Sequence, residues 1–174
     1  MKMAAIVTLV LLLVLLVGCF IYWQPARALA RKQIELEKSI DSKKTKRFKK
    51  LIAESYKDRW NFSPDDLAVT MVDIRTQYII LNLQTNESKW SIDGPKATLL
   101  VKYRVDGQPK TPAANTITQE ANKLKTPMMF TWEKQSILPW SWKLTSFDNT
   151  SIPDDAHGYQ PGDLTRAMEN LNSF

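Results

Sequence analysis

An uncharged apolar run constrains this chain more than any other feature. It extends from Ala4 to Trp23, AAIVTLVLLLVLLVGCFIYW, and its twenty positions contain no acidic or basic residue. The hydrocarbon core of a bilayer is about 30 Å thick, and an apolar helix needs about 20 residues to cross it. The run ends in Tyr22 and Trp23, two residue types that favour the bilayer interface. We therefore predict a single-pass transmembrane anchor over residues 1–24, which would tether the rest of the chain to a membrane.

Two other interpretations of this run are open. A cleaved signal peptide would use Lys2 as its basic end, but the apolar part of such a signal usually spans about 7–15 residues, and no small-x-small cleavage motif follows the run. A lipoprotein signal would use Leu16-Val17-Gly18-Cys19, which resembles a lipobox, and Cys19 would then be lipidated. Against this, the apolar run continues after Cys19, whereas mature lipoproteins usually begin with small or polar residues. Cys19 would otherwise be a small residue inside the membrane helix.

Residue content limits the chemistry of the remaining part of the chain, roughly 150 residues and enough for one domain. Cys19 is the only cysteine, which excludes an intrachain disulfide and a cysteine-based metal site. The five glycines form no glycine-rich phosphate loop, so Walker-type and Rossmann-type nucleotide sites are excluded. We expect no cofactor and no metal. The only histidine, His157, lies in a polar tail and is expected to be solvated.

Positive charge is concentrated just after the apolar run. Residues 25–60 contain twelve of the 24 lysines and arginines but only five acids. Such a position favours contact with anionic lipid head groups, whereas a nucleic-acid-binding protein more often carries its basic face on the folded domain. We predict a lipid bilayer as partner rather than nucleic acid, and a solvated helix face is the alternative. The candidate lipid contacts are Lys43, Lys44, Lys46, Arg47, Lys49 and Lys50.

The first half of the tethered part is predicted to be helical. Residues 25–42 form a stalk helix that lies on the domain. A second, amphipathic helix covers residues 43–60, because its apolar residues recur at helical spacing: Phe48, Leu51, Ile52, Tyr56 and Trp60. A third helix begins after Ser63, with Pro64 at its first position and two acids in its first turn, and ends near Thr76.

The second half is predicted to form strands. Alternating or β-prone segments cover 78–85, 89–93, 96–106, 126–135 and 141–149, with a turn at 86–88 and a breaker at Gly94-Pro95. In the last strand, alternation places Trp142 and Leu144 on one face and Phe147 on the other. Residues 107–124 are predicted to be a long loop with room for a short helix after Thr118. The polar tail, 151–174, ends in a short helix over 164–172.

This order of elements predicts an α+β fold, with helices packed on a curved, mostly antiparallel sheet. Two stretches resemble the nuclear-transport-factor-2-like (cystatin-like, cone-shaped) family: IDSKKTKRFKKLIAESYKDRW, residues 40–60, and FTWEKQ…WSWKLTSFDN, residues 130–149. The resemblance implies one cone-shaped domain, residues 43–150, with a pocket between sheet and helices. Some members of this family are isomerases, dehydratases or epoxide hydrolases. Many others are binding or assembly domains, including membrane-anchored subunits of bacterial type IV secretion channels.

Aromatic residues on the inward strand faces are the candidates for lining such a pocket, or else for filling the core: Tyr103, Phe130, Trp132 and Trp142. Enzymes of this shape need an acid, a base or a histidine inside the pocket. Asp73 on the third helix and Asp93 at a strand end could reach a pocket mouth, but carboxylates in such places are usually solvated. We therefore predict no catalytic residue.

These observations favour a non-catalytic, membrane-tethered binding or assembly domain, an accessory subunit of a membrane protein complex. The alternative is a tethered pocket protein, either a small-ligand carrier or an isomerase-like or dehydratase-like enzyme. We expect a location in the inner membrane of a bacterium. The basic residues after the anchor favour a cytoplasmic domain, whereas the signal-like start and the family resemblance favour the extracytoplasmic side, which we prefer. The oligomeric state is open.

Overall fold

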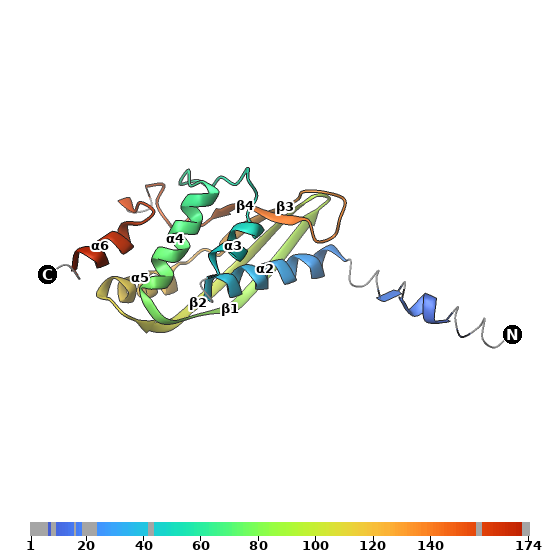
Figure 1. Ribbon diagram of the computed structural model, residues 1–174, viewed down its shortest axis with the longest axis horizontal. Helices are drawn as coiled ribbons and strands as arrows, with labels where there is room; N and C mark the ends of the chain where they lie inside the picture. Colours follow the sequence, from blue (N-terminus) through green and yellow to red (C-terminus); the bar gives the residue numbers. More distant parts are fainter. Residues whose placement is uncertain are drawn as a thin grey trace.

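The chain folds into a four-stranded antiparallel sheet with helices packed against it (Figure 1). The structure is a computed structural model that describes residues 7, 10–15, 17–18, 24–41, 44–155 and 158–171. In chain order the elements are α2 (Pro25–Asp41), α3 (Thr45–Leu51), α4 (Pro64–Thr76), β1 (Tyr78–Asp93), β2 (Lys96–Pro109), α5 (Pro112–Lys123), β3 (Met128–Lys134), β4 (Trp142–Asp148) and α6 (Asp163–Leu171). The strands lie in the order β1-β2-β3-β4, which confirms the predicted α+β class.

Most of the predicted anchor, and Cys19 in particular, lies outside the described residues. Of the helices that the structure does describe, none combines the length and the apolar character that a bilayer crossing requires.

β1 is one long strand, and the predicted turn at 86–88 is wrong. Thr85 pairs with Tyr103 and Glu87 with Lys102, so that Asn86 is an extra residue in the ladder. Such a β-bulge bends a strand and increases its twist without ending it. The true reversal lies at Gly94, whose φ of 53° is accessible to glycine at little cost.

Another bulge lies in β4 and changes the face of one aromatic residue. Thr131 pairs with Ser146 and Trp132 with Leu144, which leaves Thr145 unpaired in the β3–β4 ladder. Because one inserted residue reverses the alternation beyond it, Phe147 faces the core, with its ring centroid 5.1 Å from that of Phe130. The prediction that placed Phe147 on the outer face is therefore wrong.

The predicted helix over 43–60 is also wrong, because α3 ends at Leu51. Ile52 takes an extended conformation and bridges in parallel to Leu144. The amide of Ala53 donates to Leu144 O at 2.9 Å, and that of Lys57 donates to Thr145 O at 3.1 Å. The segment thus satisfies backbone groups on the outer edge of β4. Four apolar residues of the predicted helical stripe are nevertheless buried: Phe48, Leu51, Ile52 and Tyr56.

Helix α4 has the predicted start. The Ser63 hydroxyl accepts from the Asp66 amide at 3.2 Å, and the Asp66 carboxylate accepts from the Ser63 amide at 2.9 Å, which makes a capping box. The predicted loop over 107–124 is wrong in its first part. β2 continues to Pro109, and α5 begins at Pro112, capped by the Thr111 hydroxyl.

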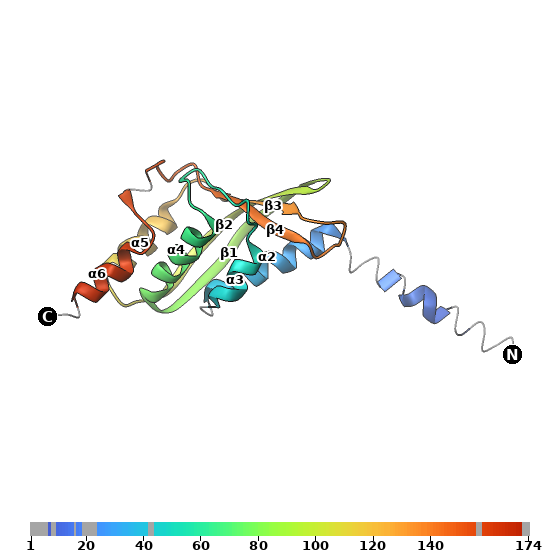
Figure 2. The ribbon, with the colours of Figure 1, turned by 45° about the horizontal axis from the view of Figure 1, so that its top comes forward.

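One hydrophobic core joins the helices to the sheet. Helices α2, α3 and α4 cover the same face of the sheet, while α5 and α6 lie near the end remote from the N-terminus (Figures 1 and 2). Leu29 and Leu36 of α2 pack in one cluster with Trp132, Trp142 and Leu144 of the last two strands. Helix α2 therefore packs into the same core as the rest of the fold.

Candidate ligand cavity

A cavity of about 270 Å³ lies between the inner face of the sheet and the helices. All four strands contribute to its walls, together with α2, α3, α4 and α5. Its lining is apolar apart from one threonine and two tyrosines: Leu36, Ile40, Phe48, Leu67, Thr70, Met71, Ile74, Tyr78, Leu81, Leu83, Tyr103, Val105, Ile117, Ala121, Met128, Phe130, Leu144 and Phe147. No acid, lysine, arginine or histidine is among these described lining residues.

Strand alternation and one bulge build these walls. Tyr103 and Val105 of β2 lie two residues apart and share the inner face, as do Met128 and Phe130 of β3. Phe147 joins them only because of the bulge at Thr145. Helix α5 contributes Ile117 and Ala121 to the walls.

The hydroxyl group of Tyr103 is held at the edge of the cavity by α2. It donates to Glu37 Oε1 and accepts from Gln33 Nε2 at 2.8 Å, while Gln33 Nε2 also donates to Glu37 at 3.1 Å. Burial, followed by the nearby charge of Glu37, raises the pKa of Tyr103 above its ordinary range. Tyr103 is therefore a neutral hydrogen-bonding group at neutral pH and does not act as a base.

The aromatic candidates divide into two sets. Tyr103 and Phe130 line the cavity. Trp132 and Trp142 are almost completely buried in the core and are not among the lining residues.

Asp73 is buried, but it is engaged away from the cavity. Its carboxylate accepts from the Tyr159 hydroxyl at 2.9 Å and from the Gly162 amide at 2.7 Å. It also accepts from the Leu164 amide at 3.3 Å and from the amide and hydroxyl of Thr165. These donors surround the first turn of α6, so Asp73 anchors that helix on α4.

Two other carboxylates, those of Asp93 and Asp58, are also absent from the described cavity lining. Asp93 is exposed at the β1–β2 turn. Asp58 accepts from the Tyr56 hydroxyl and from the Phe62 amide, each at 2.9 Å, and burial raises the pKa of its carboxyl. Within the described part of the chain, no group of three His, Cys, Asp or Glu side chains could hold a metal ion. His157 lies outside that part.

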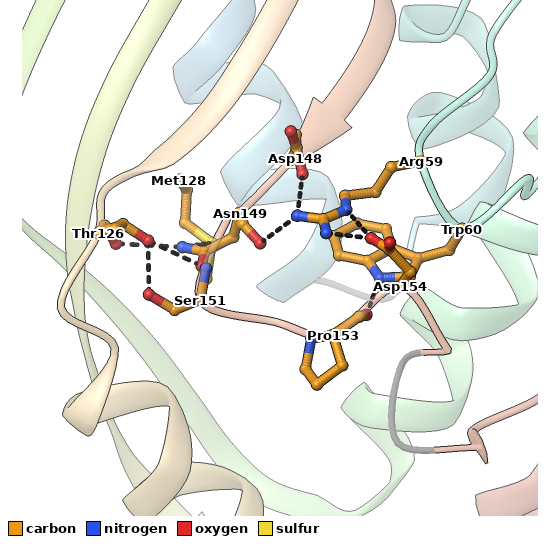
Figure 3. A network of polar contacts seen from close by, with 9 residues as sticks. All are labelled: Arg59, Trp60, Thr126, Met128, Asp148, Asn149, Ser151, Pro153 and Asp154. Carbon is orange, nitrogen blue, oxygen red and sulfur yellow. Dashed lines mark hydrogen bonds and ion pairs between the residues drawn. The ribbon is translucent and has the colours of Figure 1, made fainter.

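A polar network holds the first part of the tail against the domain (Figure 3). Arg59 bonds to Asp154, to Asp148 at 3.3 Å and to the carbonyl of Asn149 at 3.2 Å. Beside it, the Trp60 indole donates to Pro153 O at 2.8 Å. This attachment of the tail was not predicted. Its only signal in the sequence is a lone arginine before a loop and two acids more than eighty residues later.

Asn149 extends this network toward the cavity wall. Its buried side chain accepts from the Thr126 hydroxyl at 3.0 Å and from the Ser151 amide at 2.8 Å. Its amide group donates to Thr126 O at 3.1 Å and to the sulfur of Met128 at 3.4 Å. Met128 lines the cavity, so the network fixes the strand end that forms part of the wall.

The basic cluster does not form one uniform face. Arg47 pairs with Glu35 of α2 at 2.9 Å, and Lys49 pairs with Asp65 of α4 at 2.6 Å. Lys44, Lys46 and Lys50 are exposed, and Lys43 lies outside the described residues. Lipid contact by this cluster stays a prediction.

Comparison with known proteins identifies the fold. No protein-family model matches the chain, and no curated protein sequence matches it either. A candidate dehydratase of the nuclear-transport-factor-2-like family from Streptomyces avermitilis aligns over 71% of this chain and 93% of its own, with 8% identity and a TM-score of 0.52. A candidate ketosteroid isomerase from Shewanella frigidimarina aligns over 69% and 92%, with 14% identity and a TM-score of 0.52.

A third solved structure, Bd1075 of Bdellovibrio bacteriovorus, aligns over 70% of this chain with 8% identity and a TM-score of 0.53. The chain spans only 40% of the length of Bd1075. At these identities the similarities show the fold alone. They confirm the nuclear-transport-factor-2-like fold that the sequence resemblance implied.

Proposed function

We propose that this chain is a membrane-tethered, non-catalytic binding protein whose cavity holds a small apolar molecule. The observation that carries the proposal is the apolar cavity of about 270 Å³ between sheet and helices. Cavities of about 150 Å³ lined by Leu, Ile and Phe stay dry and bind benzene, and ligand pockets usually begin near 300 Å³. A compact hydrocarbon-rich molecule, such as one with one or two rings or a short branched chain, is the ligand class that this lining favours.

The choice of binding over catalysis rests on the titratable groups. General acid–base catalysis needs a group whose pKa lies near the working pH and which reaches the reacting atom. The only titratable side chains among the described lining residues are Tyr78 and Tyr103. Tyr78 donates to the carbonyl of Ala114 at 2.9 Å, and Tyr103 is occupied by α2 and has a raised pKa. Both tyrosines support the wall rather than present a base.

The tether rests on the sequence. The run of twenty uncharged residues, 4–23, ends two positions before the start of α2. A run of that length and composition fits a bilayer crossing. We propose an inner-membrane location with the domain on the extracytoplasmic side. Extraction of native membranes at alkaline pH tests the tether, since an integral chain stays in the pellet and a peripheral one is released.

Ligand binding is tested by organic extraction of the intact chain, purified from gently solubilised native membranes, followed by mass spectrometry. Ala121 faces the cavity from α5, whereas Ala113 of the same helix is exposed. We expect a compound that accompanies the wild type and Ala113→Phe but falls at least about tenfold in Ala121→Phe, a loss equivalent to about 1.4 kcal/mol.

An extract that is the same for the wild type and for Ala121→Phe would contradict the proposal. A stoichiometric protein partner in the same preparation, without such a compound, would favour the accessory-subunit role instead.

A further inference from the structure

The link between β3 and β4 presents three apolar side chains to solvent. Ile137 is 93% exposed, Trp140 54% and Leu138 43%. We call residues 135–141 the hairpin tip. Isolated exposed apolar residues need no explanation, but a contiguous set usually marks a contact surface.

Hydrogen bonds hold the hairpin tip in one shape. The Gln135 amide donates to Ser141 O at 3.0 Å, and the Ser141 amide donates to Leu138 O at 3.2 Å. The Ser141 hydroxyl donates to Ser136 O at 2.9 Å and accepts from the Ser136 amide at 3.1 Å. The exposure of the apolar side chains is therefore a property of an ordered turn.

The hairpin tip lies beside the point at which the apolar run joins the domain. Pro139 and Trp140 share a surface hollow with Ala28, Arg31 and Lys32 of the first turns of α2. Figures 1 and 2 both show the link between β3 and β4 next to the start of α2, at the end where the chain enters. Only five steps along the chain separate Trp23 from Ala28. They span about 8 Å if helical and at most about 17 Å if extended.

The surroundings of the hairpin tip are mainly basic. Arg27, Arg31 and Lys32 lie on the adjoining turns of α2, and Lys134 and Lys143 flank the tip on β3 and β4. Three acids lie nearby: Glu35 pairs with Lys32 at 3.4 Å, Glu133 pairs with Lys96 at 3.2 Å, and Asp93 is exposed in the β1–β2 turn, whose Pro95 carbonyl accepts from the Lys134 amide. A tryptophan beside apolar residues and cations is the combination that the interface of an anionic bilayer favours.

From this geometry we propose that the hairpin tip is a second membrane contact. Ile137, Leu138 and Trp140 enter the interfacial layer of the same bilayer that residues 4–23 cross, and the neighbouring cations face anionic head groups. The inference rests on the tether of the proposed function. It adds that the domain is held at two points, so that α2 and the sheet keep a fixed orientation relative to the membrane and the α5 end of the cavity points away from it.

A lipid surface fits better than a protein partner for two reasons. The predicted anchor ends where α2 begins, so the bilayer would lie next to the hairpin tip. The surface is also small: it comprises three apolar side chains, whereas a stable protein interface buries about 800 Å² on each partner and about 20–30 residues a side.

The test places a fluorescent reporter on the hairpin tip of the full chain. In a Cys19→Ala background, Ile137→Cys is labelled with an environment-sensitive nitrobenzoxadiazole dye and reconstituted into phosphatidylethanolamine–phosphatidylglycerol vesicles. Thr116→Cys, exposed on α5, is the matched control. We expect the label at 137 to show blue-shifted emission and to lose more than half of it to brominated lipid. The label at 116 should behave as in water.

Each other outcome overturns the inference in a distinguishable way. A water-like label at 137 on a chain that resists alkaline extraction would overturn the second contact and leave the tether standing. A chain released by alkaline extraction would contradict the tether and the inference together. A label that is water-like in lipid vesicles but shielded in native membranes would assign the hairpin tip to a protein partner.

Discussion

The two sides of α4 show two different uses of burial. On one side, Leu67, Met71 and Ile74 border the apolar cavity. On the other, Asp73, next to Ile74 in the chain, accepts hydrogen bonds from Tyr159 and from the first turn of α6. Buried polar atoms need partners, so the Asp73 side fixes the tail in one arrangement. Apolar walls require no partner, so the cavity side can stay empty or be filled.

Removal of the Asp73 carboxylate should have the largest effect. Asp73→Ala leaves three partly buried amides at the start of α6, those of Gly162, Leu164 and Thr165, without their acceptor, and we expect a loss of about 3–4 kcal/mol in the free energy of unfolding. Urea denaturation of the chain in detergent measures it. Asp65→Ala on the same helix is the control and should cost less than about 1 kcal/mol, because Asp65 forms only an exposed pair with Lys49. Equal losses for the two variants would contradict the distinction between the two sides of α4.

Disruption of the Asn149 network should have the second-largest effect on stability. Asn149→Ala removes the partners of the Thr126 carbonyl and the Ser151 amide from a buried site, so we expect a loss of about 2 kcal/mol and faster proteolysis of residues 149–155. Ser151→Ala, which retains its backbone bond to Asn149, should lose less than about 0.5 kcal/mol. A network that tolerates Asn149→Ala without either change would not hold the tail.

Substitution of alanine by phenylalanine distinguishes a position that borders the cavity from one in the packed core. Ala121 borders the cavity, whereas Ala97 is buried opposite Trp132 in the β2–β3 ladder. Overpacking a filled core costs about 1–3 kcal/mol. We therefore expect Ala97→Phe to lower the free energy of unfolding by at least about 1–3 kcal/mol and Ala121→Phe to leave it within about 1 kcal/mol of the wild type, both measured by urea denaturation. If Ala121→Phe is the more damaging of the two, the cavity is not available space.

The smallest effect concerns pH and the start of α4. The hydroxyl and amide of Ser63 hold the pKa of Asp66 below its ordinary value of about 3.9. A lowered folded-state pKa adds stability that is present above the unfolded-state pKa and is lost as the pH falls through the folded value. The wild type should therefore exceed Asp66→Asn by no more than about 1 kcal/mol at pH 6. The difference should shrink progressively as the pH falls below the unfolded-state pKa of about 3.9, and denaturation curves from pH 6 downward will show whether it does.

Local chemistry that depends on neighbours in the sequence could be predicted. Ser63, Pro64 and Asp66 specify the start of α4 because a capping box needs only residues three positions apart. Thr111 and Pro112 mark the start of α5 by an N-cap hydroxyl and a proline in the first turn, without a capping box, and this weaker signal lies in a polar stretch that is typical of a loop.

Features that depend on a distant partner could not be predicted. Phe147 and Asn86 owe their positions to bulges, which exist only relative to the paired strand. Ile52 and Tyr56 fit a helical stripe as well as they fit an extended segment on the edge of β4, and only the free edge of that strand decides between the two. Alternation along the strands predicts the inner face of the sheet for both Tyr103 and Trp132. Which of the two borders the cavity depends on how closely the helices pack over each of them.

Two adjacent methionines test most directly whether the cavity takes an apolar molecule. Met128 lines the cavity, whereas Met129 pairs with Leu100 on the outer face of the sheet. The intact chain, labelled with ¹³C at its methionine methyl groups and held in lipid nanodiscs, would be titrated with compact apolar compounds such as toluene or indole. We expect saturable shifts at Met128 and Met71 with Met129 unchanged. Shifts of equal size at Met128 and Met129, or none at any concentration, would contradict it.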